Sequence, residues 1–433
     1  MKAILLAAGE GLRLRPLTET IPKPLLKVLG EPILKKSIDG LNKYGIEDFI
    51  IITNYLEDQI KDYIGEEFPN LNIEFIHQVE IKGTANALLL AKSKIEEEFL
   101  IAVNGDCIYS DSLIQKTVDA AQKGIISIGG KFTKEIAKYG AILTDENNVP
   151  VKMIEKPLKE EIKEGFANIG IYSLSNEIFR IIELMEKDNS VSPRGEYEIP
   201  DAVNGLFETK KYNSQLIQLQ ENDYWFDIGH PWNLLDANET LLSFCKDERE
   251  GTIEDGVTLK GTIIIKKDAI IRSGVYIEGP VFIDEGADIG PNCYIRKFSY
   301  LGKKSRIGNG CEIKNSIIED NTHAAHLSYI GDSIIGSNCN FGAGTITANL
   351  RLDKKTIPVK IKGNKEDSKK RKLGAIVGER VKTGIGALLM PGIKIGSDSW
   401  IGAGTIVDED IPSESIYFGS QKYSLRRKRK NVN

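Results

Sequence analysis

A glycine-rich segment near the start of the chain carries residue types that can bind phosphate. The sequence "LLAAGEGLRLRPLTETIPKPLL" runs from Leu5 to Leu26. Gly9 and Gly11 permit a close approach of the backbone to an anion, and Arg13, Arg15 and Lys23 add positive charge. The segment has neither the third glycine of a dinucleotide fingerprint nor the closing GK[ST] of a Walker loop. Phosphate binding and a plain strand-to-helix turn both remain open, and the cations favour phosphate binding.

Two of the four histidines of the chain, His323 and His326, stand three residues apart in a region that otherwise resembles scaffold. Imidazole titrates near neutral pH and is therefore a common general base. A lone histidine in a repeat is more often a polar residue that its surroundings satisfy. The six-residue repeat described below slips at these two positions, so we expect at least one of the two side chains to point outward.

Short apolar runs alternate with amphipathic helical patterns in the first half of the chain. Residues 2–8, 48–53 and 98–106 are predicted strands, and residues 31–45 and 112–124 are predicted helices. This alternation predicts a Rossmann-like α/β domain over residues 1–235, with a mostly parallel sheet and helices on both faces. Residues 236–250 are expected to form a helical connector.

A period of six governs the second half, residues 251–433. It predicts a left-handed parallel β-helix of hexapeptide repeats, in which each aliphatic side chain points into a narrow core. The polar and basic stretch 354–373 interrupts the period and is expected to be a loop at one corner, with or without a function. The aliphatic positions are Ile253, Leu259, Ile265, Ile271, Ile277, Ile283, Ile289, Ile295, Leu301, Ile307 and Ile313, then Ile318, Ile330, Ile335 and Phe341 after register slips, and finally Val377, Leu389, Ile395, Ile401 and Val407.

Composition narrows the class of protein. A chain of 433 residues is too long for one ordinary core, and its net charge of -5 disfavours a dedicated nucleic-acid binder. The five cysteines are scattered without CxxC spacing, which predicts neither a disulfide framework nor a zinc site and favours a reducing compartment. No apolar run approaches the roughly 20 residues of a membrane span. We therefore expect a soluble, cytoplasmic protein with no membrane or nucleic-acid partner.

The order of short motifs in the first half resembles the sugar-1-phosphate nucleotidylyltransferases. G-x-G-x-R followed by K-P opens the series, and "QVEIKGTANAL", "VNGDCI", "KYGAIL", "EKP", "ANIGIY", "RGEYEIPDA" and "WFDIGHPWNLLDAN" continue it in order. The family commonly has Thr where this chain has Leu12, which removes one hydroxyl near the triphosphate.

This resemblance implies roles for individual residues. Arg13 and Lys23 would be catalytic, and Asp106 and Asp227 would ligate Mg²⁺, an ion that prefers oxygen ligands. Both aspartates follow predicted strands, where open α/β sheets bind ligands. The base would be a pyrimidine, so that UTP and dTTP both remain open. The nucleotide would contact Leu6, Ala8, Gly9, Gly11, Gln78, Gly83 and Thr84, and the sugar phosphate would contact Gly140, Glu155 and Asn168.

In the second half, "HLSYIGD" and "NFGAGTITAN" resemble the acetyltransferase domain of the bifunctional glucosamine-1-phosphate N-acetyltransferase/N-acetylglucosamine-1-phosphate uridylyltransferases, in an archaeal-like version. The resemblance implies that His326 is the general base, that Ala343 and Ala403 adjoin acetyl-CoA, and that the chain forms a homotrimer. Glu379 replaces the serine usual near CoA, and the basic tail 424–430 either contacts CoA phosphates or is simply solvated. The amino-sugar phosphate would contact Arg296, Lys314, Tyr329, Asn340 and Asn349, with Lys355 as a further candidate.

Together these features predict a bifunctional enzyme of UDP-N-acetylglucosamine synthesis. One alternative is a glucose-1-phosphate uridylyl- or thymidylyltransferase whose β-helix is only structural. Another is a regulatory scaffold like the exchange subunits of an initiation factor, which share both domain types without catalysis. The set around His326 disfavours the first alternative, and the retained Arg13, Lys23, Asp106 and Asp227 disfavour the second.

Overall fold

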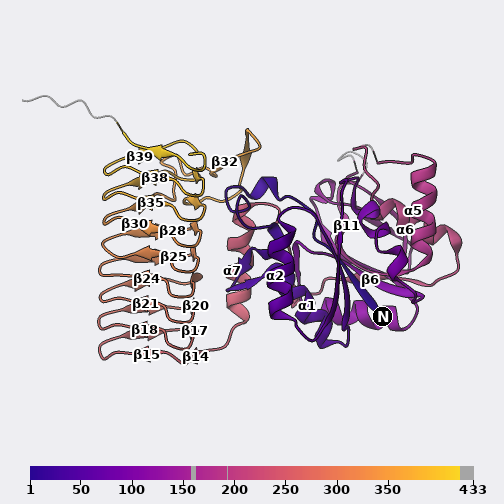
Figure 1. Ribbon diagram of the computed structural model, residues 1–433, viewed down its shortest axis with the longest axis horizontal. Coiled ribbons are helices and arrows are strands. Elements are labelled where there is room, and N and C mark those ends of the chain that lie inside the picture. The colour runs from indigo at the N-terminus through magenta and orange to yellow at the C-terminus, as the bar shows by residue number, and fades with distance from the viewer. Residues whose placement is uncertain (158–161, 193, 420–433) are drawn as a thin grey trace, which may run out of the picture. The chain divides into compact units, whose positions relative to one another are not determined.

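The computed structural model describes residues 1–157, 162–192 and 194–419. The chain divides into two compact units (Figure 1). The first contains residues 1–14 and 20–237, and the second contains residues 15–19 and the chain from residue 238 onward. The basic tail 424–430 lies outside the described residues.

The first unit is built on a nine-stranded sheet. Its centre is parallel, with the order β6-β1-β4-β5, and β11 extends it by antiparallel pairing with β6, β8 and β9. The parallel sheet predicted from the apolar runs is therefore confirmed for these four strands. The strands are β1 (Lys2–Leu6), β4 (Asp48–Thr53), β5 (Asn72–His77), β6 (Phe99–Asn104), β8 (Ile126–Thr133), β9 (Ala141–Thr144), β10 (Pro150–Ile154), β11 (Gly165–Ser175) and β12 (Ser214–Gln218). Two short pairs stand apart, β2 (Lys27–Val28) with β3 (Glu31–Pro32) and β7 (Cys107–Tyr109) with β13 (Trp225–Asp227).

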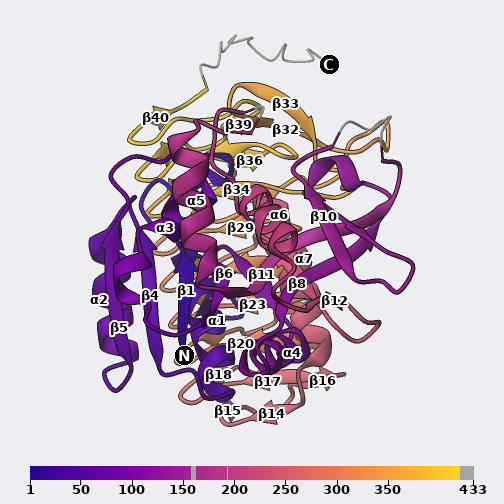
Figure 2. The ribbon, with the colours of Figure 1, turned by 90° about the vertical axis from the view of Figure 1, so that its right-hand side faces the viewer.

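Helices cover both faces of this sheet (Figure 2). Along β1, Ile4 packs in one core with side chains of α3, α5 and α6, whereas Ala3 and Leu5 pack in a second core with α1, α2 and α4. Successive residues of a strand point to opposite faces, so an unbroken apolar strand serves both layers. The helices are α1 (Ile33–Lys43), α2 (Glu57–Glu67), α3 (Thr84–Leu89), α4 (Asp111–Gln122), α5 (Glu177–Lys187) and α6 (Ile199–Thr209), with short 3₁₀ turns η1 (Leu12–Leu14), η2 (Lys23–Leu25), η3 (Lys92–Lys94) and η4 (Ile136–Lys138).

The connector between the two halves is helical over a different range from the one expected. Helix α7 (Pro231–Phe244) begins before residue 236 and ends well before residue 250. Glu248–Arg249 already form β14, which pairs with the strand Ile263–Ile265 of the prism. Proline fits the first turn of a helix, where its missing N–H is not needed, and this explains the early start at Pro231.

The second unit contains a prism of parallel strands stacked in three sheets (Figure 1). This is the arrangement expected of a left-handed parallel β-helix, and the predicted fold class is confirmed. The first sheet contains β14 (Glu248–Arg249), β17 (Ile263–Ile265), β20 (Val281–Ile283), β23 (Ser299–Leu301), β26 (Ile317–Ile318), β29 (Ile334–Ile335), β34 (Ile376–Val377) and β37 (Lys394–Ile395). The second contains β15 (Thr252–Ile253), β18 (Ile270–Ile271), β21 (Asp288–Ile289), β24 (Arg306–Ile307), β27 (His323–Ala324), β30 (Asn340–Phe341), β35 (Lys382–Thr383), β38 (Trp400–Ile401) and β40 (Ile416–Tyr417). The third contains β16 (Thr258–Lys260), β19 (Tyr276–Glu278), β22 (Tyr294–Ile295), β25 (Glu312–Lys314), β28 (Tyr329–Gly331), β31 (Ile346–Thr347), β36 (Leu388–Leu389) and β39 (Ile406–Val407).

The residues at the predicted six-residue spacing form the prism core, with one exception at its first coil. Ile295 stacks on Ile313, and Ile313 stacks on Ile330. Ile253, in the first coil, is instead 37% exposed, because no coil lies beneath it. Ala324 fills the core position at the register slip, between Ile307 and Phe341.

The basic stretch after residue 353 is not the plain loop that we expected. Residues 358–367 form a hairpin of β32 (Pro358–Ile361) and β33 (Asn364–Asp367). Ile357 and Val359 are buried and lie close to Gly392 of the prism, where an added Cβ would meet Ile357 Cγ2 at 2.6 Å. Charged residues dominate the composition of this stretch, but its alternating apolar residues are buried, and the stretch therefore folds as a hairpin with a packed face. In the described part of the chain, no helix is both long and apolar enough to cross a bilayer.

Candidate functional sites

Two aspartates meet at the end of the parallel strands in the first unit. Asp106 lies two residues beyond the end of β6, and Asp227 is the last residue of β13, where it pairs with Cys107 of β7. Ligand atoms of Asp106, Cys107 and Asp227 all lie within 4.8 Å of one another. The structure thus brings together the two carboxylates that the sequence predicts as metal ligands, and it adds a sulfur atom that the sequence analysis did not assign.

A buried lysine lies close to both carboxylates. Lys23 Nζ lies 2.5 Å from Asp106 Oδ2 and 3.9 Å from Asp227 Oδ1. Burial alone would lower the pKa of Lys23, but the two carboxylates outweigh burial and raise the pKa. Burial and the neighbouring charge of Asp106 raise the pKa of Asp227. The site therefore holds more negative charge than one lysine balances, and a divalent cation would relieve the excess.

A cavity of about 220 Å³ opens beside the aspartates. Tyr172 and Trp225, which the sequence analysis did not single out, contribute aromatic walls. The cavity joins the predicted metal ligands to the predicted sugar-binding residues and to Arg13. Seven of the residues predicted from sequence line it, namely Arg13, Thr84, Asp106, Gly140, Glu155, Asn168 and Asp227.

Within the lining of this cavity, three predicted sugar-binding residues lie against one another. The backbone N–H of Asn168 donates to the carbonyl oxygen of Gly140 at 2.7 Å. A Cβ at Gly140 would lie 2.8 Å from Oε2 of Glu155, so only glycine leaves this carboxylate in place. Asn168 Nδ2 donates to the hydroxyl of Tyr172 at 2.6 Å. Burial raises the pKa of Glu155.

Glu198 is a buried carboxylate in the same cavity to which the sequence analysis gave no role. It accepts a hydrogen bond from Thr84 Oγ1 at 3.0 Å and pairs with Arg194 at 3.0 Å. Burial, followed by the charge of Glu155, raises its pKa. Glu198 belongs to the motif "RGEYEIPDA", and this motif was the signal in the sequence that could have identified it.

The remaining predicted nucleotide-binding residues do not line this cavity. Gly11 adopts φ +69°, a conformation that favours glycine. Gly83, at φ +111°, precedes α3, and an added Cβ there would lie 2.3 Å from the carbonyl oxygen of Tyr197. The Gln78 side chain is buried and donates to Asn86. Leu6 is the last residue of β1, and Ala8 and Gly9 lie in the loop after this strand.

In the second unit, His326 lies at the corner between the second and third sheets of the prism. It follows β27 and precedes β28, and its side chain is exposed rather than packed in the coil stack. The carbonyl oxygen of His326 accepts the backbone N–H of Gly344, and that of Ala343, one coil further, accepts the N–H of Gly386. His326 and Ala343 therefore occupy the same position of successive coils. At the same corner, the carbonyl oxygen of Ile385 accepts the N–H of Gly404. Ala403, which directly precedes Gly404, therefore lies on this corner as well.

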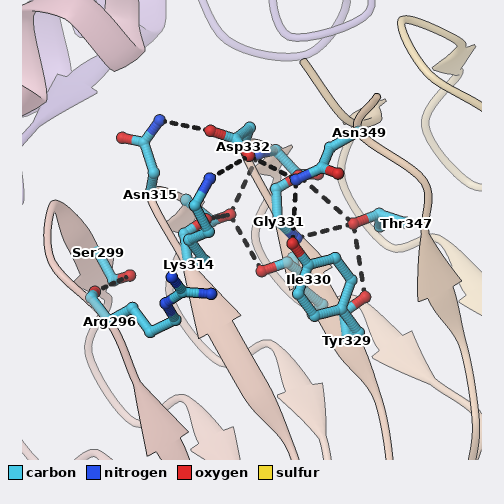
Figure 3. A network of polar contacts seen from close by, with 12 residues as sticks. Arg296, Ser299, Lys314, Asn315, Tyr329, Ile330, Gly331, Asp332, Thr347 and Asn349 are labelled. Carbon is cyan, nitrogen blue, oxygen red and sulfur yellow. Dashed lines mark hydrogen bonds and ion pairs between the residues drawn. The ribbon is translucent and has the colours of Figure 1, made fainter. Parts of the chain in front are cut away.

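A polar network lies along the other edge of the third sheet (Figure 3). Asn349 Nδ2 donates to the Tyr329 hydroxyl at 3.0 Å and to Asp332 Oδ2 at 2.5 Å. Lys314 Nζ lies 2.8 Å from the same Oδ2. Burial raises the pKa of Tyr329, so its hydroxyl keeps its proton. Three of the predicted sugar-phosphate residues are thus joined through Asp332.

Arg296 stands beside this network and lines a cavity of about 270 Å³ together with Lys314 and Asn315. Its guanidinium donates to Glu312 at 2.8 Å and lies 5.4 Å from the ring centroid of Tyr294. Asn340 lies elsewhere, on the second sheet, where it pairs with His323. Within one chain, the structure brings together Arg296, Lys314, Tyr329 and Asn349, and it leaves Asn340 outside this group.

Known proteins match both halves of the chain. Residues 2–243 match the nucleotidyl transferase family, and residues 277–390 match the GMPPB C-terminal domain. A relative called bifunctional protein GlmU, from Methanococcus maripaludis strain C7, is 46% identical over 429 residues, which cover 99% of this chain and all of the relative. The GlmU protein of Methanocaldococcus jannaschii is 42% identical over 427 residues, with the same coverage.

A bifunctional sugar-1-phosphate nucleotidylyltransferase/acetyltransferase from Sulfurisphaera tokodaii is 39% identical over 413 residues, which cover 95% of this chain and 98% of the relative. The chain belongs to this bifunctional nucleotidylyltransferase/acetyltransferase family. It is therefore both a nucleotidyltransferase and an acetyltransferase, and the alternatives of a merely structural prism and of a non-catalytic scaffold are disfavoured. A solved UDP-glucose pyrophosphorylase has TM-score 0.50 and 23% identity, and the match covers 56% of this chain and 98% of that one; it supports the fold of the first unit alone.

Proposed function

We propose that this member of the bifunctional family makes UDP-N-acetylglucosamine in two steps. The second unit transfers the acetyl group of acetyl-CoA to the amine of glucosamine 1-phosphate. The first unit then transfers UMP from UTP to the N-acetylglucosamine 1-phosphate, with release of pyrophosphate. The observation that carries the proposal is that one chain holds both the Lys23–Asp106–Asp227 cluster and, in its second unit, an exposed His326 and the Asp332 network.

In the first unit, the nucleophile is a phosphate oxygen that is already anionic, so the site needs no general base. Its task is to align this oxygen with the α-phosphorus and to stabilise the departing pyrophosphate. Lys23 and Arg13 supply positive charge for that purpose. Gly140, Glu155 and Asn168 hold the sugar at the other end of the cavity. The loop with Gly9 and Gly11 holds the phosphates of the nucleotide, while Gln78, Gly83 and Thr84 hold its base.

Asp106 and Asp227 fit a bound Mg²⁺. Their oxygen atoms are close enough to share one ion, and both carboxylates are only partly screened by Lys23. Mg²⁺, when bound, neutralises charge on the phosphate oxygens. The adjacent Cys107 keeps its thiol proton, because burial and the two aspartates raise its pKa well above the usual range.

In the second unit, His326 takes a proton from the amine of glucosamine 1-phosphate while the nitrogen attacks the thioester carbonyl. The new N–C bond replaces the C–S bond, and the proton that His326 has taken passes to the departing sulfur, so that CoA leaves as a thiol. Arg296 and Lys314 bind the phosphate of the sugar, and the Tyr329 hydroxyl, which accepts from Asn349, donates its own proton to a phosphate oxygen. Asn340 and Lys355 stay predicted contacts of the same substrate.

The small side chain of Ala343 in the coil next to His326, and that of Ala403 further along the same corner, leave room for the extended arm of acetyl-CoA. We further propose a homotrimer located in the cytoplasm, because the bifunctional family that the second half resembles has this organisation.

The proposal is tested by two assays on the same full-length preparation. Thiol release from acetyl-CoA is measured with glucosamine 1-phosphate and, as the control, with glucose 1-phosphate. Pyrophosphate release from UTP is measured with N-acetylglucosamine 1-phosphate and Mg²⁺, with dTTP as the competing nucleotide. We expect amine-dependent thiol release and UTP-dependent pyrophosphate release. A preparation that releases pyrophosphate but no thiol would contradict the proposal and restore the single-activity enzyme.

A further inference from the structure

Asp332 is a buried carboxylate at the centre of the polar network in Figure 3, and the proposed reaction has not yet used it. Its side chain is 4% exposed. Three side chains donate to it. Lys314 Nζ and Asn349 Nδ2 reach Oδ2 at 2.8 and 2.5 Å, and Asn315 Nδ2 reaches Oδ1 at 2.8 Å.

The backbone fixes this carboxylate as firmly as the side chains do. The N–H of Asp332 donates to the carbonyl oxygen of Lys314 at 2.8 Å, and its carbonyl oxygen accepts the N–H of Gly374 at 2.7 Å. The residue adopts φ +50°, a conformation that aspartate and asparagine tolerate better than most residues. The position of the carboxylate is therefore set by the coil itself and does not depend on a bound ligand.

The carboxylate in turn sets the position of two predicted substrate contacts. Lysine has a flexible stem and a freely rotating ammonium group, so a fixed anion is needed to hold Nζ in one place. The side-chain amide of Asn349 has two orientations that exchange its oxygen and nitrogen atoms. The hydrogen bond to Asp332 selects the orientation in which Nδ2 faces the carboxylate. The same Nδ2 then donates to the Tyr329 hydroxyl, which leaves the hydroxyl proton directed elsewhere.

The neighbouring ion pair of Arg296 and Glu312 is more exposed than the pair of Lys314 and Asp332. Arg296 pairs with Glu312, and both side chains are more than one-third exposed. An exposed pair contributes little and is easily exchanged for a ligand phosphate. Lys314 and Asp332 are 17% and 4% exposed, and removal of one partner leaves the other charge buried.

Resting on the acetyl transfer proposed above, we infer that Asp332 is a positioning residue for the phosphate of the amino sugar. It does not touch the reacting atoms. It holds Lys314, Asn349 and, through Asn349, Tyr329 in the arrangement that receives a phosphate oxygen. A role in positioning predicts a selective loss of affinity for the sugar phosphate, whereas a role in stability alone predicts no such selectivity.

The experiment uses the full-length chain with Asp332→Asn and Asp332→Glu. The first keeps the shape and removes the charge, and the second keeps the charge and displaces it by one methylene group. Glu285→Gln is the matched control, because Glu285 pairs with Lys303 at 2.8 Å on an exposed part of the same prism. Steady-state acetyl transfer gives KM for glucosamine 1-phosphate, KM for acetyl-CoA and kcat, and competition by inorganic phosphate gives its inhibition constant. Circular dichroism checks that each variant is folded at the assay temperature.

We expect at least a tenfold rise in KM for glucosamine 1-phosphate in both Asp332 variants and a parallel rise in the inhibition constant of phosphate. KM for acetyl-CoA should stay within twofold, and Glu285→Gln should match the wild type. Unchanged KM for the sugar phosphate, an equal rise for both co-substrates, or unfolding of both Asp332 variants would overturn the inference. Absence of thiol release in the wild type would instead reject the proposed acetyl transfer itself, so the two failures are distinguishable.

Discussion

Lys23 Nζ lies 2.5 Å from Asp106 Oδ2, and this one contact joins two segments that are 83 residues apart in the chain. Lys23 is the first residue of η2, in the segment between β1 and β2, and Asp106 follows β6, the strand next to β1 in the sheet. The pairing of these two parallel strands thus delivers a cation and an anion to the same point. The pair holds a cation beside an anion at the point where the proposed nucleotidyl transfer needs them.

Lys23→Met should abolish nucleotidyl transfer and loosen the metal-free first unit. We expect pyrophosphate release to fall at least about 100-fold, because a preorganised charge on the phosphates is lost. Without Lys23, Asp106 and Asp227 repel each other, so the free energy of unfolding should drop by about 1–3 kcal/mol. Thermal denaturation with and without Mg²⁺ checks this, and Mg²⁺ should stabilise the variant more than the wild type. Equal stabilisation of both proteins would contradict the assigned pairing.

Asp106→Asn should remove Mg²⁺ binding while the domain stays folded. The amide keeps the shape of the carboxylate but supplies one neutral oxygen, and the remaining Asp227 pairs more closely with Lys23. Calorimetry with Mg²⁺ and UTP should show at least a tenfold loss of affinity, and pyrophosphate release should become undetectable. Thiol release by the second unit serves as the internal control. Near-normal pyrophosphate release would reject the metal assignment.

His326→Ala should abolish acetyl transfer and leave nucleotidyl transfer intact. General base catalysis contributes typically 10²–10⁴-fold, so thiol release should fall by about that factor. His323→Ala is the matched control, because His323 is also exposed and lies three residues away on β27. The control should retain at least half of the wild-type rate. Equal loss in both variants would show that the region has a structural role only.

Gly83→Ala should weaken nucleotide binding without affecting the prism. The added Cβ would lie 2.3 Å from the Tyr197 carbonyl oxygen, and φ is +111° at this position, so α3 must shift. We expect KM for UTP to rise at least about tenfold, since misplacement by even about 1 Å is costly at such sites. Gly65→Ala in α2 is the control, because nothing lies within 4 Å of its added Cβ. An unchanged KM for UTP would mean that the loop around Gly83 does not contact the nucleotide.

Glu155→Gln should stabilise the first unit at neutral pH and lose this effect in acid. Burial raises the pKa of Glu155 in the folded state, so its ionisation opposes folding. The penalty is absent below the pKa of a glutamate in the unfolded chain, roughly 4.3. It is complete above the pKa of Glu155 in the folded state. At pH 7.5 the variant should melt roughly 2–4 °C higher, the shift that about 1 kcal/mol produces in a domain of this size. The difference should shrink as the pH approaches 4.5.

Glu146→Gln, an exposed carboxylate in a turn, is the control for this series and should melt with the wild type at every pH. Uridylyl transfer should fall in Glu155→Gln despite the gain in stability, because the carboxylate faces the proposed sugar site. A variant that is less stable at pH 7.5 than at pH 4.5, relative to the wild type, would contradict the burial argument.

The sequence was most informative where local patterns repeat. The spacing of six from Leu259 to Ile313 predicts the core of the prism, since each such residue stacks on the one a coil below. The prediction was wrong for the basic stretch, because the buried Ile357 and Val359 were hidden among lysines. It was also wrong for the ends of the connector, because helix boundaries depend on capping and on the first strand of the prism.

The sequence by itself determined the two fold classes and the outward position of at least one of the paired histidines, because these depend on periodicity and on its interruption within short segments. Only the tertiary structure decided that Lys23 lies close to two aspartates, that Glu198 shares a cavity with Glu155, and that Asp332 joins Lys314 to Asn349. These relationships depend on strand order and on the stacking of coils 17 or 18 residues apart. A local sequence pattern does not show which side chains this stacking brings within hydrogen-bonding distance.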